Sequence, residues 1–197
     1  MSTQKKGSIA FAVCGSFCTL DAALHAAEAL AAQGWELWPI MSFAAQQDTR
    51  FGTGKFWRDR LAALAGRPVL DTLQAVEPLG PKHMAQALVI APCTGATLAR
   101  LAAGLSDTPV TLAAKSLLRV GCPVVISVST NDGLGASGEN IARLYQRKRF
   151  YFVPYGQDDP AGKPNSLKAD LAQLPAALDA AQQHRQLQPV LLGQNRS

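Results

Sequence analysis

Residues 87–105 read ALVIAPCTGATLARLAAGL, an apolar run that passes through Pro, Thr and Gly into a second apolar pattern. The run ALVIA (87–91) shows no polar alternation, which is typical of a strand buried on both faces of a parallel sheet. The pattern that follows predicts a helix at about 95–105. The connection between them holds more small polar residues than a turn needs, so it requires a further explanation.

The same strand-to-helix alternation recurs along the chain. Further strands are predicted at 8–13, 36–41, 68–70, 123–128 and 150–153. Further helices are predicted at about 20–31, 56–66, 110–119 and 139–148, with a last helix running from Ser166, capped by Asn165 and Ser166, into the 170s or 180s. Pro39 favours an edge position or a bulge for its strand. The alternation predicts an α/β fold, a three-layer Rossmann-like or flavodoxin-like domain with about six parallel strands.

Length and composition favour one domain over residues 1–197, because no linker or second core is evident, and residues 1–6 and 194–197 are expected to fray. Charged residues make up only 17% of the chain, which indicates either surface covered by other subunits or an Ala-rich helical surface. The net charge of +5 comes from scattered Lys and Arg, so it favours a small anion over nucleic acid.

Neither membrane insertion nor export is expected from the sequence. No uninterrupted apolar run approaches the roughly 20 residues that span a bilayer, and residues 1–6 are polar. The four cysteines, Cys14, Cys18, Cys93 and Cys122, form no paired CxxC motif. We therefore expect a cytoplasmic protein with reduced, structural thiols and no metal site.

Small, hydroxyl-rich or Gly-rich loops follow five of the predicted strands, at 14–19, 42–54, 92–97, 127–135 and 154–166. Ligands of open α/β sheets bind at this carboxyl edge. Gly15 and Ser16 precede a helix start, where free N–H groups and the helix dipole favour a phosphate, although Thr19 as an ordinary N-cap explains part of the pattern. Because neither G-x-G-x-x-G nor a P-loop is present, a mononucleotide is favoured over NAD(P) or ATP.

The connection after ALVIA fits the same interpretation. Pro92 is expected to end the strand, since it needs no hydrogen-bond acceptor for its nitrogen. Thr94 and Thr97 would offer hydroxyls at the next helix start, and Gly95 would permit a ligand to approach closely. A capping threonine alone explains Thr94 but not the combination. The sequence thus predicts a ligand at this turn.

Several segments carry a resemblance to known families. The stretch IAPCTGATLARLAAGLSDTPVTLAA (90–114) resembles the AP-x-[ST]-x-x-T segment of the homo-oligomeric flavin-containing cysteine decarboxylases. Within that superfamily the chain is similar to the B subunits of dipicolinate synthase from endospore-forming bacteria. This closer similarity rests on GSFCT (15–19), TRFGTG (49–54), VSTNDGLG (128–135) and YFVPYGQDDP (151–160).

The resemblance implies a function and a set of partners. It implies oxidation of dihydrodipicolinate to dipicolinate together with the synthase's nicotinamide-dependent A subunit, which carries NAD(P), in the mother cell of a sporulating bacterium. It also implies a trimer-based homo-oligomer and a bound FMN. The residues expected to line the FMN site are Gly15, Ser16, Ser42, Pro92, Thr94 and Thr97.

Two further residues are expected to bind the substrate. Asn131 stands where the superfamily holds a substrate carboxylate, although Asn131-Asp132-Gly133 also suits a simple turn. Arg50, on a Gly-flanked loop, can bind a carboxylate by donating two hydrogen bonds to it. The alternative interpretation is an ordinary surface arginine.

One departure from the superfamily concerns histidine. The decarboxylases use a His in or near the loop after the second strand, and SFAAQQDTRFGTGKFW (42–57) contains none. A decarboxylase role is therefore disfavoured. It remains an alternative beside a flavin-binding oligomer with a non-catalytic assembly role, and no catalytic residue is assigned.

Overall fold

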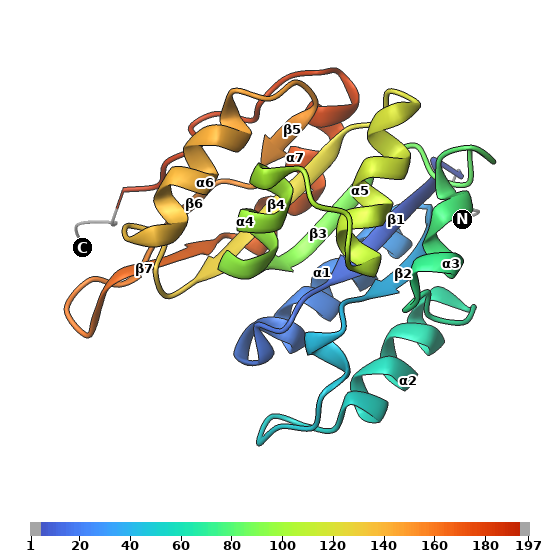
Figure 1. The fold of residues 1–197 in the computed structure, drawn as a ribbon, viewed down its shortest axis with the longest axis horizontal. Coiled ribbons are helices and arrows are strands. Elements are labelled where there is room, and N and C mark those ends of the chain that lie inside the picture. Colours follow the sequence, from blue (N-terminus) through green and yellow to red (C-terminus); the bar gives the residue numbers. More distant parts are fainter. Residues whose placement is uncertain (1–4, 194–197) are drawn as a thin grey trace.

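The computed structural model describes residues 5–193, and its centre is a mostly parallel sheet (Figure 1). The strands follow the order β2-β1-β3-β4-β7-β6, and β5 pairs with β4 beside this path. The parallel strands are β1 (Gly7–Val13), β2 (Trp35–Met41), β3 (Leu88–Cys93), β4 (Val124–Thr130) and β5 (Phe150–Phe152). This confirms the predicted α/β class, with five parallel strands.

The strand predicted at 68–70 is wrong. Only Leu70 pairs with the sheet, through an isolated bridge to Ile40. Pro68 has no N–H to donate, which limits the pairing of this short segment. Pro39 lies in β2, which forms one edge of the sheet, as the sequence predicted.

The helix predicted to begin at Ser166 is also wrong, and so are the caps assigned to Asn165 and Ser166. Residues 154–169 contain an antiparallel hairpin, β6 (Tyr155–Asp159) and β7 (Lys163–Ala169), and the last helix, α7, is Leu174–Gln182. Asp159-Pro160-Ala161-Gly162 forms the turn, where the Asp159 carboxylate accepts the Gly162 N–H at 2.9 Å. β7 pairs with the end of β4 and carries the hairpin onto the sheet.

Helices cover both faces of the sheet (Figure 1). One face carries α4 (Gly95–Ala103), α5 (Pro109–Arg119) and α6 (Ala136–Tyr145), and the other carries α1 (Leu20–Ala32) and α7. α2 (Gly54–Ala65) packs against β2 and α1, and the short α3 (Leu73–Val76) packs against α5. The three layers agree with the predicted architecture.

Short 3-10 helices complete the connections, at Phe17–Thr19, Ala44–Gln46, Glu77–Leu79 and Leu171–Gln173. Helix ends follow their local sequence. Thr53, Thr94 and Thr108 cap α2, α4 and α5 with their side chains, and Gly66 and Gly104 end α2 and α4 in the left-handed conformation.

The buried apolar residues form one cluster that spans the sheet and both helix layers. Of the ends expected to fray, residues 1–4 and 194–197 lie outside the described part of the chain. Lys6 lies within it, and its N–H donates to the Gly34 carbonyl at 3.0 Å. Within residues 5–193, no helix combines the length and apolarity needed to cross a bilayer.

Candidate functional site

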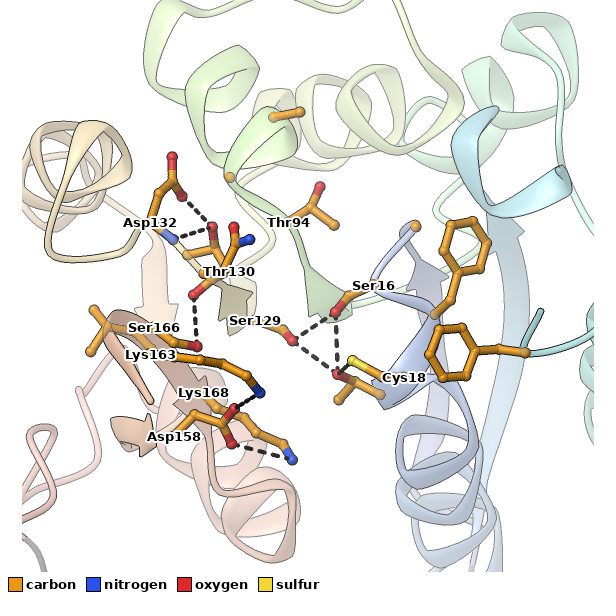
Figure 2. A pocket seen from close by; sticks show the side chains of 18 of the residues that line it. Ser16, Cys18, Thr94, Ser129, Thr130, Asp132, Asp158, Lys163, Ser166 and Lys168 are labelled. Atoms are coloured by element: carbon orange, nitrogen blue, oxygen red, sulfur yellow. Dashed lines mark hydrogen bonds and ion pairs between the residues drawn. The ribbon is translucent and has the colours of Figure 1, made fainter. Parts of the chain in front are cut away.

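A cavity of about 620 Å³ opens at the carboxyl edge of the sheet (Figure 2). Its walls come from the loops after β1, β2 and β3, the end of β4 and the β6–β7 hairpin, so it joins all five loops that the sequence singled out. The lining residues are Gly15, Ser16, Phe17, Cys18, Thr19, Arg50, Phe51, Thr94, Gly95, Ala96, Ser129, Thr130, Asn131, Asp132, Asp158, Lys163, Ser166, Leu167 and Lys168.

Three hydroxyl groups meet where the loop after β1 approaches the end of β4. Ser16 Oγ lies 2.9 Å from Ser129 Oγ, and Thr19 Oγ1 lies 3.0 Å from Ser129 Oγ and 3.2 Å from Ser16 Oγ. Thr19 makes no side-chain cap to α1, so the expected N-cap is wrong. Its hydroxyl instead contacts Ser129 on β4. We call Ser16, Thr19 and Ser129 the hydroxyl triangle.

The turn after β3 forms the next wall. Thr94 Oγ1 accepts the Thr97 N–H at 3.4 Å and caps α4, which leaves the first-turn N–H groups of Gly95 and Ala96 beside the cavity. Pro92 does not end the strand, since β3 continues to Cys93 with a register shift. An irregularity of this kind is one of the places where a strand accommodates a proline.

Ser42, Pro92 and Thr97 are buried and do not line the cavity. Thr97 Oγ1 lies 3.3 Å from Cys14 Sγ, and Ser42 Oγ accepts the Ala45 N–H at 3.2 Å. Burial raises the pKa of the Cys14 thiol to about 11, while hydrogen bonds from Thr97, Thr94 and Ser42 oppose that shift. These residues form a supporting layer behind Gly15, Ser16 and Thr94.

The end of β4 brings polar residues to the floor of the cavity. The Asp132 carboxylate accepts hydrogen bonds from the hydroxyls of Thr130 and Ser137, the latter at 2.7 Å. These two bonds, Thr130 first, hold the pKa of Asp132 below its usual value. Asn131, one residue earlier, is exposed and lines the cavity.

The loop after β2 contributes Arg50 and Phe51 at the tip of a tight turn. Thr49 and Gly52 exchange backbone hydrogen bonds of 3.0 and 3.1 Å across this turn. The Arg50 guanidinium lies 4.8 Å from the centre of the Phe51 ring, and both residues line the cavity. The structure therefore brings Arg50 and Asn131 to one site, together with Gly15, Ser16 and Thr94.

The β6–β7 hairpin supplies three charged residues that were not predicted to belong to the site, Asp158, Lys163 and Lys168. Asp158 and Lys163 belonged to the predicted loop 154–166, and Lys168 belonged to the helix predicted to begin at Ser166, so none of the three was expected in the sheet. The sequence Asp-Pro-Ala-Gly at 159–162 is typical of a tight turn between strands, and it was the signal for a hairpin at this position.

An excess of positive side chains, together with hydroxyl hydrogen-bond donors, makes the cavity suitable for an anion. Three cationic side chains, Arg50, Lys163 and Lys168, face two carboxylates, Asp132 and Asp158. Within the described chain, no cluster of three or more His, Cys, Asp or Glu side chains offers a metal site.

Comparison with known proteins agrees with this architecture. The profile of the family described as Flavoprotein matches residues 1–154. The chain therefore belongs to the Flavoprotein family.

Within that family its particular relatives are the B subunits of dipicolinate synthase. It is 42% identical to the dipicolinate synthase B subunit of Bacillus subtilis strain 168 over 193 residues, 98% of this chain and 96% of that protein. The crystal structure of the corresponding B subunit from Bacillus halodurans has a TM-score of 0.88 at 39% identity, covering 98% of this chain and 99% of that one. The FMN-dependent cysteine decarboxylase SpaF shares the fold, with a TM-score of 0.66 at 24% identity, covering 89% and 97%.

Proposed function

We propose that this chain is the B subunit of a dipicolinate synthase. Together with the synthase's nicotinamide-dependent A subunit, it would convert dihydrodipicolinate to dipicolinate. The ring would lose two hydrogens, one as a hydride to the nicotinamide and one as a proton to water. The observation that carries this proposal is the 42% identity to one such B chain over almost the whole of both proteins. We propose that the chain acts in the cytoplasm of the mother cell of a sporulating bacterium.

The residues of the cavity fit a flavin mononucleotide. N–H groups at the start of α4 and the hydroxyls of Ser16 and Thr94 can donate to a phosphate. The rings of Phe17 and Phe51 offer apolar faces for a flat ring system. A bound flavin would supply reversible two-electron chemistry. Ser42, Pro92 and Thr97 would support this surface from behind.

The same cavity fits a dicarboxylate. Dipicolinate carries two carboxylates that point apart across a ring nitrogen, so its site needs donors on more than one loop. Arg50 and Asn131 lie on different loops around one cavity, and their side chains offer a guanidinium and an amide. We propose that they bind the substrate.

Assembly forms part of the proposal. Phe43, Phe51 and Phe56 are between 42% and 48% exposed around the loop that joins β2 to α2. Large aromatic side chains at a protein surface are typical of contact with other subunits. We propose that this loop lies at a subunit contact, either in a trimer-based homo-oligomer or with the A chain of the synthase. Light scattering that gives a monomeric mass at micromolar concentration would contradict the homo-oligomer.

A second candidate function is that of a flavin-binding oligomer with a decarboxylase or assembly role. The decarboxylase is disfavoured because none of the three histidines, which all lie within the described residues, lines the cavity. The assembly role predicts flavin binding without any effect on dipicolinate formation.

The proposal is tested by co-purification. When the nicotinamide-dependent partner from the same organism carries an affinity tag, it is expected to retain this chain through gel filtration. The chain is also expected to take up FMN and turn yellow. A chain that neither associates with this partner nor retains FMN would contradict the proposal. FMN uptake without association would favour the second candidate.

A further inference from the structure

Two lysines of the β6–β7 hairpin share a single carboxylate at the cavity. Lys163 Nζ lies 3.4 Å from Asp158 Oδ2, and Lys168 Nζ lies 3.8 Å from Asp158 Oδ1. Figure 2 shows the ammonium groups of both lysines beside the Asp158 carboxylate. The lysine side chains are 59% and 47% exposed, so they are accessible to a ligand. One carboxylate opposite two ammonium groups leaves this wall with a surplus positive charge.

The register of the sheet places one of these lysines beside the hydroxyl triangle. Lys168 is the antiparallel partner of Ser129 on β4. Residues directly opposite in such a pair have Cα atoms about 4.5–5.5 Å apart and project to the same side. Lys168 therefore leaves the sheet next to Ser129, whose hydroxyl contacts Ser16 and Thr19. An ammonium beside hydroxyl donors is suited to an anionic oxygen.

The other charged groups that line the cavity are Arg50 and Asp132, and neither lies on the hairpin. Arg50 faces the cavity from the loop after β2, away from the hairpin. Asp132 is occupied by the hydroxyls of Thr130 and Ser137. Among the described residues, the free positive charge thus lies on two separate walls, and a ligand with two negative groups matches that division.

We propose that Lys163 and Lys168 are specificity-determining residues that bind one carboxylate of the dicarboxylate. Arg50 and Asn131 bind the other one. Asp158 is a positioning residue that keeps the two ammonium groups together. This inference rests on the proposed function, because it specifies how the same cavity selects a substrate with two carboxylates over one with a single carboxylate.

The test compares dipicolinate with picolinate, which has the same ring and one carboxylate, by isothermal titration calorimetry. The parent is expected to bind dipicolinate more tightly. Lys163→Met and Lys168→Met are each expected to weaken dipicolinate binding by about tenfold or more, the effect of one charged hydrogen bond, and picolinate binding by much less. Lys168→Arg is expected to restore most of the preference. Lys148→Met, at an exposed lysine after α6, is the matched control and should behave as the parent.

Each outcome bears on a different claim. Lysine variants that keep the parental affinity and preference would overturn the inference and leave the proposed function standing. A parent that binds neither acid would contradict the proposed function and the inference together. Variants that lose FMN binding but keep dipicolinate binding would show that the lysines serve a phosphate, which also overturns the inference.

Discussion

Ser16 and Ser129 are 113 residues apart in the chain, and their Oγ atoms lie 2.9 Å apart. This contact joins the loop after β1 to the end of β4 across the intervening strand β3. Thr19 makes the third hydroxyl contact and fixes the start of α1 against β4. Because of these contacts, the separate polar loops of the sequence form the walls of one cavity.

A negative charge at Ser16 is expected to weaken FMN binding. Two like charges about 4 Å apart repel each other by roughly 1–4 kcal/mol, so Ser16→Asp should weaken binding by about fivefold or more. Quenching of flavin fluorescence measures the affinity. Ser106→Asp, on the loop between α4 and α5, is the control and should bind FMN as the parent does. Parental affinity in Ser16→Asp would remove the phosphate from this position.

A methyl group at Gly95 is expected to destabilise the protein. A Cβ there would lie 2.5 Å from Ser137 Oγ and 2.9 Å from Thr130 Oγ1, so the floor of the cavity would have to shift. Overpacking of this kind costs about 1–3 kcal/mol, measured as a lower free energy of unfolding in urea. The control is Gly193→Ala, where a Cβ meets no atom within 4 Å. A Gly95→Ala variant as stable as its control would contradict the packing described.

The Asp132 carboxylate is expected to contribute stability that depends on pH. Its pKa is lowered in the folded state from the usual 3.8, so the contribution is present above that value and is lost as the pH falls through the lowered pKa. The difference in free energy of unfolding between the parent and Asp132→Asn should therefore shrink in acid. Other carboxyl groups occur in both proteins and cancel. A difference that does not change with pH would argue against these hydrogen bonds.

The Cys18 thiol is expected to react with an alkylating reagent before the thiols of Cys14 and Cys93. Cys18 is exposed at the cavity, whereas Cys14 and Cys93 are buried and burial raises the pKa of both. Iodoacetamide at about pH 8 should modify Cys18 in the native protein and reach Cys14 and Cys93 only after unfolding. Peptide mass spectrometry identifies the sites. Rapid native modification of Cys14 would mean that the layer behind the cavity opens.

The strands and helices of the parallel sheet were predictable because their signals are local. Unbroken apolar runs such as 87–91 mark buried strands, and Gly66 stops α2 where the sequence indicated. The hairpin was missed because polar residues interrupt both of its strands, so β6 and β7 show no apolar run. Only their pairing with each other and with β4 makes them strands.

The candidate site was likewise predictable in part, where its signals are local in the sequence. Loop positions predicted Gly15, Ser16 and Thr94 beside Asn131, since all follow parallel strands at one edge. The direction of a side chain depends on packing that sequence spacing does not determine, and Ser42 and Thr97 lie behind the cavity around Cys14. Lys168 comes to the cavity through its pairing with Ser129, a contact between segments that are distant in the sequence.

Whether this chain is a synthase subunit is decided by measuring dipicolinate formation, by chromatography, in a mixture of the chain and the proposed nicotinamide-dependent A subunit. Dipicolinate is expected from the mixture, and little is expected from either protein alone. At limiting precursor, Asn131→Ala and Arg50→Ala are each expected to lower the rate of dipicolinate formation by about tenfold or more, with folding and oligomer size unchanged. An A subunit that forms dipicolinate equally well without this chain would contradict the role of the chain as a synthase subunit. Parental kinetics in both variants would exclude Asn131 and Arg50 from the substrate site.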